Sequence, residues 1–494
     1  MINYLSHAGK IFFGNSQKIN AKLSPVDNQI ISNYQDDAVA VNQAIDFLSS
    51  NRNTIKSLTN LELKNIALTF IKKIDEHADE LTKIISQETG KTIWESKTEV
   101  SALKAKAQGT LEQWENQNKT TLKDALPGVL GEVQTKPLGI ISVLGPFNFP
   151  MHLPNGQIIP AILKGNSVLF KPSELTPGCG EWYCRLWWEA GLPEGALALV
   201  QGQREVGVQS TINPSINGIF FTGSVPTGIA IMKATADTPQ KLVALEMGGV
   251  NPLAIWDDAN LEAAAFAAVT GFCLSTGQRC TATRRILIHS KIYNEFKNQF
   301  LKLTSKIQPG LPTDNVFCGP LISAGSKDKF HAAKNRLVKS GGSIVFEQKL
   351  NSSLPTSGGF VGQTIIEGGD IKNFVKEETF SPLVVLEKIN DMAELQEKCS
   401  WSLYGLSASI FTTQEKIYHD FWQGIQSGLI NWNQPTNGAS AKLPFGGVGL
   451  SGNHRPAGYD MIEHCSYKVS SLINSNPENL LKAAYPGLND SQKK

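Results

Sequence analysis

The sequence predicts an α/β protein built on two doubly wound parallel sheets. From Gly139 onwards, short β-rich runs are separated by segments long enough for a helix, and a second alternating region extends from about Pro252 to Asn431. Such alternation is typical of parallel strands joined by crossover helices. The chain has 494 residues, so two or three domains are expected. The runs of the first region are Ile140–Leu144, Ser167–Lys171, Leu197–Gln201 and Gly218–Phe221.

The first part of the chain is expected to be helical and then to form a hairpin. Thr59 and Glu62 have the spacing of a capping box, in which the glutamate side chain reaches back to the N–H of Thr59. Apolar residues then recur at helical spacing, and Gly90 marks the end of that pattern. The tract from about Thr120 to Lys136 is polar, punctuated by Gly and Pro and weakly alternating, which predicts a hairpin arm.

Composition and charge exclude several classes of partner. The formal net charge is +2, from 46 basic and 44 acidic residues, so no attraction to nucleic acid or to an anionic membrane is expected. The longest apolar stretches, such as Gly139–Gly145, are far shorter than the roughly 20 residues of a membrane helix. The beginning of the chain lacks a basic region followed by an apolar one, so no secretory signal is expected. The seven cysteines are scattered without a Cys-x-x-Cys pair, which argues against a disulfide framework or a metal site and favours the cytoplasm.

Cys280, in Gly277-Gln-Arg-Cys280, is the first candidate for chemistry. It follows a glycine, adjoins Arg279 and is expected near a strand-to-helix transition. Such a setting predicts an exposed thiol with a lowered pKa. Taken alone, the pattern fits a buried, inert cysteine better.

Glu246 and Asn148 are the second and third candidates. Glu246 stands in an apolar, glycine-flanked segment, where its pKa should be raised as a general base requires. The alternative is a surface glutamate that ends a strand. Asn148 lies between Pro146 and Pro150 directly after a buried strand, where its amide could donate to an oxyanion. The alternative is a rigid turn.

The segment Phe221–Gly228 follows a β-run and is expected to turn into a helix whose start binds a pyrophosphate. It matches neither Gly-x-Gly-x-x-Gly nor a P-loop. Gly447, Gly449 and Gly452 do match Gly-x-Gly-x-x-Gly. No strand-like run precedes them and Pro456 follows too closely for a helix, so we interpret that match as coincidental.

Together, these segments resemble the aldehyde dehydrogenase superfamily. They occur in its order over roughly residues 10 to 475: Pro146–Pro150, Lys171–Glu174, Phe221–Ser224, Glu246–Gly249, Gly277–Cys280, Glu377–Pro382 and Pro444–Gly447. Two departures are conservative: Glu377–Ser381 replaces a more usual ending in Ile-Phe-Gly, and Met247 stands where leucine is common.

The resemblance implies a domain organisation. The NAD-binding domain would comprise residues 1–119 and 138–247, and the catalytic domain residues 248–446. Residues 120–137 and 465–475 would form a small β arm for oligomerisation, which implies a homodimer or a dimer of dimers.

The resemblance also implies roles. Cys280 would attack an aldehyde, Asn148 and the Cys280 N–H would hold the oxyanion, and Glu246 would activate water to hydrolyse the thioester, with no metal required. NAD would bind through residues that these motifs contain: Lys171 and Glu174 at the adenosine ribose, Gly223, Ser224, Val225, Pro226, Thr227 and Gly228 at the pyrophosphate, and Glu378 and Phe380 at the nicotinamide. A glutamate at the ribose would repel a 2′-phosphate, which favours NAD over NADP.

Three further segments, His152–Gly156, Asn431–Asn433 and Ser451–Pro456, resemble a subfamily that oxidises the semialdehyde of N-succinylated glutamate in arginine catabolism. This substrate carries two carboxylates, so its site needs hydrogen-bond donors. Candidates are Gly452, Asn453 and Arg455, shortly after Phe445. Arg455 could instead form a surface or subunit-interface salt bridge. Glutamate or succinate semialdehyde as substrate, and a CoA-acylating reaction, remain alternatives.

Overall fold

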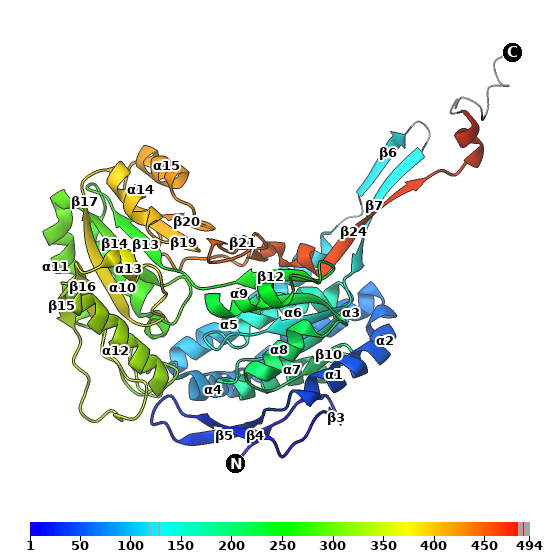
Figure 1. The fold of residues 1–494 in the computed structure, drawn as a ribbon, viewed down its shortest axis with the longest axis horizontal. Coiled ribbons are helices and arrows are strands. Elements are labelled where there is room, and N and C mark those ends of the chain that lie inside the picture. The colour runs from blue at the N-terminus through cyan, green and yellow to red at the C-terminus, as the bar shows by residue number, and fades with distance from the viewer. Residues whose placement is uncertain (118–119, 127–128, 483–487, 489–494) are drawn as a thin grey trace.

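Two α/β bodies and a projecting arm make up the molecule (Figure 1). The structure is a computed structural model that describes residues 1–117, 120–126, 129–482 and 488. Each body is built around a seven-stranded sheet, and the arm is a three-stranded sheet. Among the described residues, no helix combines the length and the apolar character that crossing a membrane requires.

The first sheet has the strand order β12-β11-β8-β9-β10-β2-β3. Its strands are β2 His7–Ala8, β3 Ile11–Phe12, β8 Ile140–Leu144, β9 Ser167–Lys171, β10 Leu197–Leu199, β11 Ile216–Thr222 and β12 Leu242–Glu246. The five strands β8 to β12 are parallel, as the alternating pattern predicts. From β8 the chain builds outward through β9 and β10 on one side, and through β11 and β12 on the other. The strand order therefore reverses between β8 and β11, the position at which ligands bind in doubly wound sheets.

Both faces of this sheet are buried. Ile141 and Val143 of β8 pack into one hydrophobic cluster, and Ile140 and Leu144 into another on the opposite face. The covering helices are α1 Val39–Ser50, α2 Arg52–Lys56, α3 Asn60–Glu76, α4 Ala78–Thr89, α5 Ile93–Glu115, α6 His152–Leu163, α7 Pro177–Glu189, α8 Arg204–Ile212 and α9 Val225–Ala234. Strands covered in this way are apolar along their whole length, which explains their continuous β-rich runs.

The segment between Thr59 and Gly90 forms two helices, α3 and α4, separated at His77. The predicted capping box is confirmed: the Thr59 N–H donates to Glu62 Oε2 at 2.8 Å, and the Glu62 N–H donates to Thr59 Oγ1 at 3.3 Å. Gly90 ends α4 with φ = +77°, a conformation that favours glycine.

The second sheet has the order β15-β16-β17-β14-β13-β19-β20 and is parallel except for the pair β15–β16. Its strands are β13 Asn251–Ile255, β14 Thr283–His289, β15 Ser343–Glu347, β16 Thr364–Glu367, β17 Leu383–Ile389, β19 Ser407–Phe411 and β20 Leu429–Trp432. Its helices are α10 Leu261–Cys273, α11 Tyr293–Thr304, α12 Ala324–Lys339, α13 Ile371–Phe374, α14 Met392–Ser400 and α15 Glu415–Gly424. This sheet accounts for the second alternating region.

Short elements complete the two bodies. A small sheet near the N-terminus contains β1 Asn3–Tyr4, β4 Ile19–Leu23 and β5 Ile30–Gln35. Two-residue strands pair as β18 Tyr404–Gly405 with β22 Val448–Gly449, and as β21 Pro444–Phe445 with β23 Ala457–Gly458. Four 3₁₀ turns cover Leu274–Gly277, Ser290–Ile292, Tyr459–Cys465 and Pro477–Lys482.

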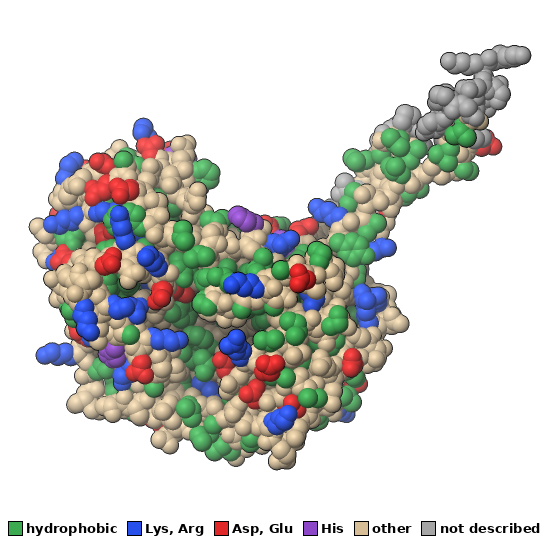
Figure 2. Space-filling view, viewed as in Figure 1, with side chains coloured by type: hydrophobic (Ala, Val, Ile, Leu, Met, Phe, Trp, Pro, Cys, Tyr) green, Lys and Arg blue, Asp and Glu red, His purple; other side chains and the backbone are tan. Residues whose placement is uncertain are grey.

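The arm consists of β6 Thr120–Leu126, β7 Val129–Pro137 and β24 Ser466–Ile473, which pair antiparallel in the order β24-β7-β6. It extends well away from both bodies (Figure 1). Apolar side chains gather on its outer part (Figure 2), where Leu122, Leu126 and Leu472 are exposed. Exposed apolar patches of this kind mark interaction sites. The patch therefore supports the prediction that the arm joins subunits, and that role stays a prediction.

Candidate active site

Cys280 lies in a tight connection between α10 and β14. The predicted strand-to-helix transition is therefore wrong, because here a helix leads into a strand. Ser275 and Thr276 take positive φ values of 53° and 55°, and Gly277 has φ = +70°. A Cβ on Gly277 would lie 2.4 Å from the Ser381 carbonyl carbon, so only glycine fits. This constrained turn determines where the thiol stands.

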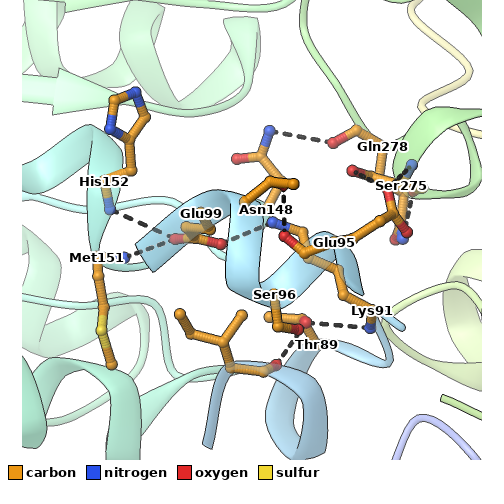
Figure 3. Close-up of polar contacts among 12 residues, drawn as sticks. Thr89, Lys91, Glu95, Ser96, Glu99, Asn148, Met151, His152, Ser275 and Gln278 are labelled. Carbon is orange, nitrogen blue, oxygen red and sulfur yellow. Dashed lines mark hydrogen bonds and ion pairs between the residues drawn. The ribbon is translucent and has the colours of Figure 1, made fainter. Parts of the chain in front are cut away.

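Asn148 reaches the same turn from the first sheet. It follows β8 and is buried, and its amide donates to the Gln278 carbonyl at 3.1 Å (Figure 3). From the second sheet, the Asn251 amide donates to the Cys280 carbonyl at 2.7 Å. The turn that carries Cys280 is thus held from both sheets. The sequence analysis missed Asn251, whose only signal was a polar residue at the start of a buried strand.

Glu246 is the last residue of β12 and is only 6% exposed, so the alternative of a surface glutamate is wrong. Its Oε1 accepts a hydrogen bond from the Ala457 N–H at 3.1 Å. Its Oε2 is buried and has no hydrogen-bond partner among the described residues. Burial raises the pKa of Glu246 well above its usual value, which confirms the expected direction. A carboxyl group with this pKa and a free oxygen can accept a proton.

The pKa of the Cys280 thiol is raised to about 12, so the predicted lowering is wrong. Burial is the main cause, and the charges of Glu378 and Glu246 add to it. Arg279 does not reverse the shift, and its guanidinium lies 5.1 Å from the Phe149 ring centre and 3.9 Å from Glu95 Oε1. The thiol is therefore protonated at neutral pH in this state and needs a base to become a nucleophile.

The segment Gly223–Gly228 runs from the end of β11 into the start of α9, beside the reversal of strand order. Ser224 precedes the helix. Its hydroxyl lies 3.0 Å from Thr227 Oγ1 and does not accept a hydrogen bond from an N–H of the first helical turn. Val225 and Pro226 form the first turn, whose N–H groups have no side-chain cap in the described structure. A Cβ on Gly228 would meet Met247 Sδ at 2.4 Å, so glycine lets α9 approach β12. The arrangement fits an anionic group such as a pyrophosphate.

Lys171 and Glu174 lie at the carboxyl end of β9. The Lys171 ammonium is 3.7 Å from Glu174 Oε2 and donates to the Pro172 carbonyl at 3.0 Å. Lys171 is buried, whereas the Glu174 side chain is 41% exposed. The carboxylate is thus accessible to a ligand and already next to a cation.

Glu378 and Phe380 enter the site from the second body. Glu378 Oε1 accepts a hydrogen bond from the Gly249 N–H at 3.1 Å, three residues after Glu246. Burial raises the pKa of Glu378 to about 7, opposed by the charge of Arg284. Phe380 has φ = +43°, and its ring meets the Phe147 ring edge-on at 5.7 Å between centres. These contacts join the two bodies beside Cys280.

The loop with Gly452, Asn453 and Arg455 runs along the edge of β12. Gly452 bridges to Glu246, and the Asn453 side chain bonds to the main chain of Val243 and Leu245 at 2.8 and 2.9 Å. Arg455 is exposed, and its guanidinium donates to the Val243 carbonyl at 3.3 Å. Phe445 pairs with Ala457 in a short strand pair. Among the described residues no α-helix follows Gly447, Gly449 and Gly452, which is consistent with a coincidental match.

A buried polar network that the sequence analysis missed supports the site (Figure 3). Glu95 of α5 accepts from the Ser275 N–H at 2.6 Å, which secures the turn before Cys280. Glu99, one helical turn later, pairs with Lys91 at 2.7 Å and accepts from the Met151 N–H at 3.2 Å. The spacing of Glu95 and Glu99, four residues apart, places them on one face of a helix. Because charged residues on one face of a helix usually point to solvent, this spacing did not predict a buried network.

Comparisons with known proteins show the family of this chain. The aldehyde dehydrogenase family model matches residues 12–470. An N-succinylglutamate 5-semialdehyde dehydrogenase from Novosphingobium aromaticivorans is 39% identical over 83% of this chain and 86% of its own. Among solved structures, betaine aldehyde dehydrogenase from Staphylococcus aureus in complex with NAD⁺ superposes with a TM-score of 0.91 at 25% identity, covering 96% of each chain. An NADP-dependent enzyme from Escherichia coli does so with a TM-score of 0.91 at 25% identity, covering 96% of this chain and 98% of its own. With a family match over most of its length and a shared fold, the chain belongs to the aldehyde dehydrogenase family.

Proposed function

We propose that the protein oxidises N-succinyl-L-glutamate 5-semialdehyde to N-succinyl-L-glutamate with NAD, through a thioester on Cys280. The observation that carries the thioester chemistry is that Asn148 binds the turn of Cys280 and that the charge of Glu246 acts on the Cys280 thiol. The relatives' name supports the choice of substrate. Turnover measured with NAD across a panel of succinylated glutamate, glutamate and succinate semialdehydes tests it. A preference for either of the smaller semialdehydes would contradict the substrate assignment.

The residues of this chain divide the chemistry among them. The Cys280 thiol gives up its proton to solvent, and the sulfur attacks the aldehyde carbon as a thiolate. The second N–H of the Asn148 amide and the Cys280 N–H stabilise the oxyanion; loss of one such donor typically costs about 10²–10³ in rate. A bound oxidised nicotinamide supplies the hydride acceptor. Glu246 then deprotonates the water that hydrolyses the thioester and releases the acid.

The presence of Glu246 as a base argues against the alternative of a CoA-acylating reaction. Transfer of the acyl group to CoA gains from the absence of a hydrolytic base, whereas Glu246 is present and buried with a raised pKa. We therefore favour hydrolysis. Acid formation without added CoA is the expected result.

The family uses a nicotinamide cofactor, and we infer NAD. Glu174, Lys171 and the start of α9 fit the ribose and the pyrophosphate, as Glu378 and Phe380 fit the nicotinamide end. Lys171 could attract a 2′-phosphate, but its charge is directed to Glu174. The exposed Glu174 carboxylate would accept from the ribose hydroxyls and repel a 2′-phosphate.

Glu174→Ala is expected to weaken NAD binding about ten- to a hundred-fold, since a hydrogen bond to a charged acceptor contributes roughly 1.5–3 kcal/mol. The preference for NAD over NADP should fall at the same time, because a repulsive charge is removed. Dissociation constants for both cofactors, measured by titration, check this. Glu194→Ala, which removes an exposed glutamate, is the control. An unchanged preference for NAD would show that Glu174 does not contact the ribose.

We also propose that the loop carrying Gly452, Asn453 and Arg455, close to Phe445, binds one of the two substrate carboxylates. The Arg455 guanidinium is exposed and makes one hydrogen bond among the described residues, to Val243, so most of its donors remain available there. Arg455→Ala should lower kcat/KM for the succinylated substrate about ten- to a hundred-fold. An uncharged short aldehyde should be affected little, and equal losses on both substrates would indicate a structural role.

We also propose the boundaries of the domains and the assembly of the subunits. Residues 1–119 and 138–247 would bind the cofactor and residues 248–446 would carry the nucleophile. Residues 120–137 and 465–475, of which 127–128 lie outside the described residues, would join subunits into a homodimer or a dimer of dimers. The exposed Leu122, Leu126 and Leu472 of the arm support this.

A further inference from the structure

Helix α5 carries a third buried charge, Lys106, that the mechanism does not use. It is 6% exposed and lies on the face of α5 that bears Glu95 and Glu99. Glu95 and Glu99 are both satisfied, by Ser275 and by Lys91 respectively. The Lys106 ammonium has no hydrogen bond and no ion pair among the described residues. A buried charge without a partner is costly, so its persistence points to a partner that binds from outside the protein.

Lys106 lies beside α6, the helix that follows Asn148. A Cβ on Gly156 of α6 would approach Lys106 Cε to 3.3 Å, so this glycine leaves room for the lysine side chain. Asn155 fixes the two helices together, because its amide donates to the Leu103 carbonyl at 3.1 Å and its oxygen accepts from Tyr183. The position of the ammonium group relative to the site is therefore set by a rigid helix pair.

His152 begins α6, four residues after Asn148 and four before Gly156. Its ring is directed away from the Glu99 carboxylate (Figure 3) and meets the Phe149 ring at 6.1 Å between centres. Its Nδ1 is buried without a partner in the described structure. Burial lowers the pKa of His152 to about 4, so the imidazole is neutral at pH 7 and adds no charge beside the lysine. Burial also lowers the pKa of Lys106 to about 8, which leaves it mostly protonated at pH 7.

The position of Lys106 beside α6 suits a long substrate. His152 and Gly156 are one helical turn apart, about 6 Å along α6. Lys106, which packs against Gly156, therefore lies about one helical turn further along α6 from Asn148 than His152 does. In an extended N-succinylglutamate semialdehyde, eight bonds separate the aldehyde carbon from the succinyl carboxylate, about 9 Å at the rise of an extended backbone. The far carboxylate of such a substrate therefore needs a cation well beyond the residues around Asn148, as Lys106 beside Gly156 provides.

We propose that Lys106 binds the succinyl carboxylate of the substrate, with Gly156 and His152 forming the walls of this end of the site. The proposal rests on the proposed function and deepens it. Lys106 then selects substrates with a carboxylate far from the aldehyde, while the loop around Arg455 receives the carboxylate nearer to it.

The test compares Lys106→Met with the wild-type protein, because methionine keeps the aliphatic length and removes the charge. For the succinylated semialdehyde, KM should rise about ten- to a hundred-fold, with kcat changed only a few-fold. For an uncharged short aldehyde, kcat/KM should change less than about two-fold. Lys106→Arg should restore most of the affinity, because the positive charge returns. Lys104→Met is the matched control, since Lys104 is on the same helix but pairs with Asp75.

A second measurement separates this proposal from the proposed function. N-succinyl-L-glutamate should inhibit oxidation of the uncharged aldehyde, and Lys106→Met should weaken that inhibition about ten-fold or more. Equal losses of kcat/KM on both aldehydes, or unchanged inhibition in Lys106→Met, would overturn the role of Lys106. Failure of the wild-type protein to oxidise the succinylated semialdehyde would instead refute the proposed function, and the inhibition experiment would still decide whether Lys106 binds the carboxylate.

Discussion

Cys280→Ser is expected to reduce aldehyde oxidation by roughly 10²- to 10⁶-fold, while NAD still binds. A hydroxyl has a far higher pKa than a thiol and is a poorer nucleophile at neutral pH. The change is nearly isosteric, so the turn held by Asn148 and Asn251 should persist. Steady-state NADH formation together with a cofactor titration measures both effects.

The control for this experiment is Cys399→Ser. Cys280 and Cys399 are the two cysteines that are not fully buried, and Cys399 lies on α14, outside the catalytic turn. Cys399→Ser should retain wild-type turnover. If Cys280→Ser kept more than about a hundredth of wild-type turnover, Cys280 would not be the nucleophile.

Glu246→Gln is expected to separate the two halves of the reaction. The amide cannot accept the proton of water, so hydrolysis should stop after one NADH per site, with the acyl group retained on Cys280. Glutamine still accepts from the Ala457 N–H through its carbonyl oxygen, which preserves the side-chain position. Rapid-mixing kinetics would record the single turnover, and intact-protein mass spectrometry would detect the acyl adduct.

Two results would speak against the role of Glu246. An unmodified protein after incubation with aldehyde and NAD would mean that the thioester does not accumulate. Loss of the initial burst would mean that Glu246 is needed first, to deprotonate the thiol whose pKa is raised to about 12. Glu262→Gln, on the exposed first turn of α10, is the control and should turn over normally.

The fold class could be predicted from the sequence because its causes are local. Strands buried on both faces must be apolar throughout, so β8 and β9 were recognisable within their own five residues. The capping box at Thr59 needs only residues three positions apart, and it forms as predicted. The break at His77 between α3 and α4 has no comparable local signal, since the helical pattern continues across it.

The candidate site could be predicted only in part. Asn148, Glu246 and Cys280 stand out as polar groups beside glycines or prolines, at the ends of buried elements. The pKa of Cys280 could not be predicted correctly, because it depends on burial and then on the charges of Glu378 and Glu246, which only the folded chain brings near the thiol. Arg279 is its neighbour in sequence, yet the Arg279 side chain is directed to Glu95 and Phe149.

The sequence by itself thus determined the α/β class and the family and supplied the candidate residues for catalysis, since each depends on patterns a few residues long. The tertiary structure decided the protonation of Cys280, the support of its turn by Glu95 and Asn251, and the isolation of Lys106. All three depend on burial and on long-range electrostatic contacts. Desolvation shifts a pKa and makes an unpaired charge costly, and no local pattern reports which distant groups surround a side chain.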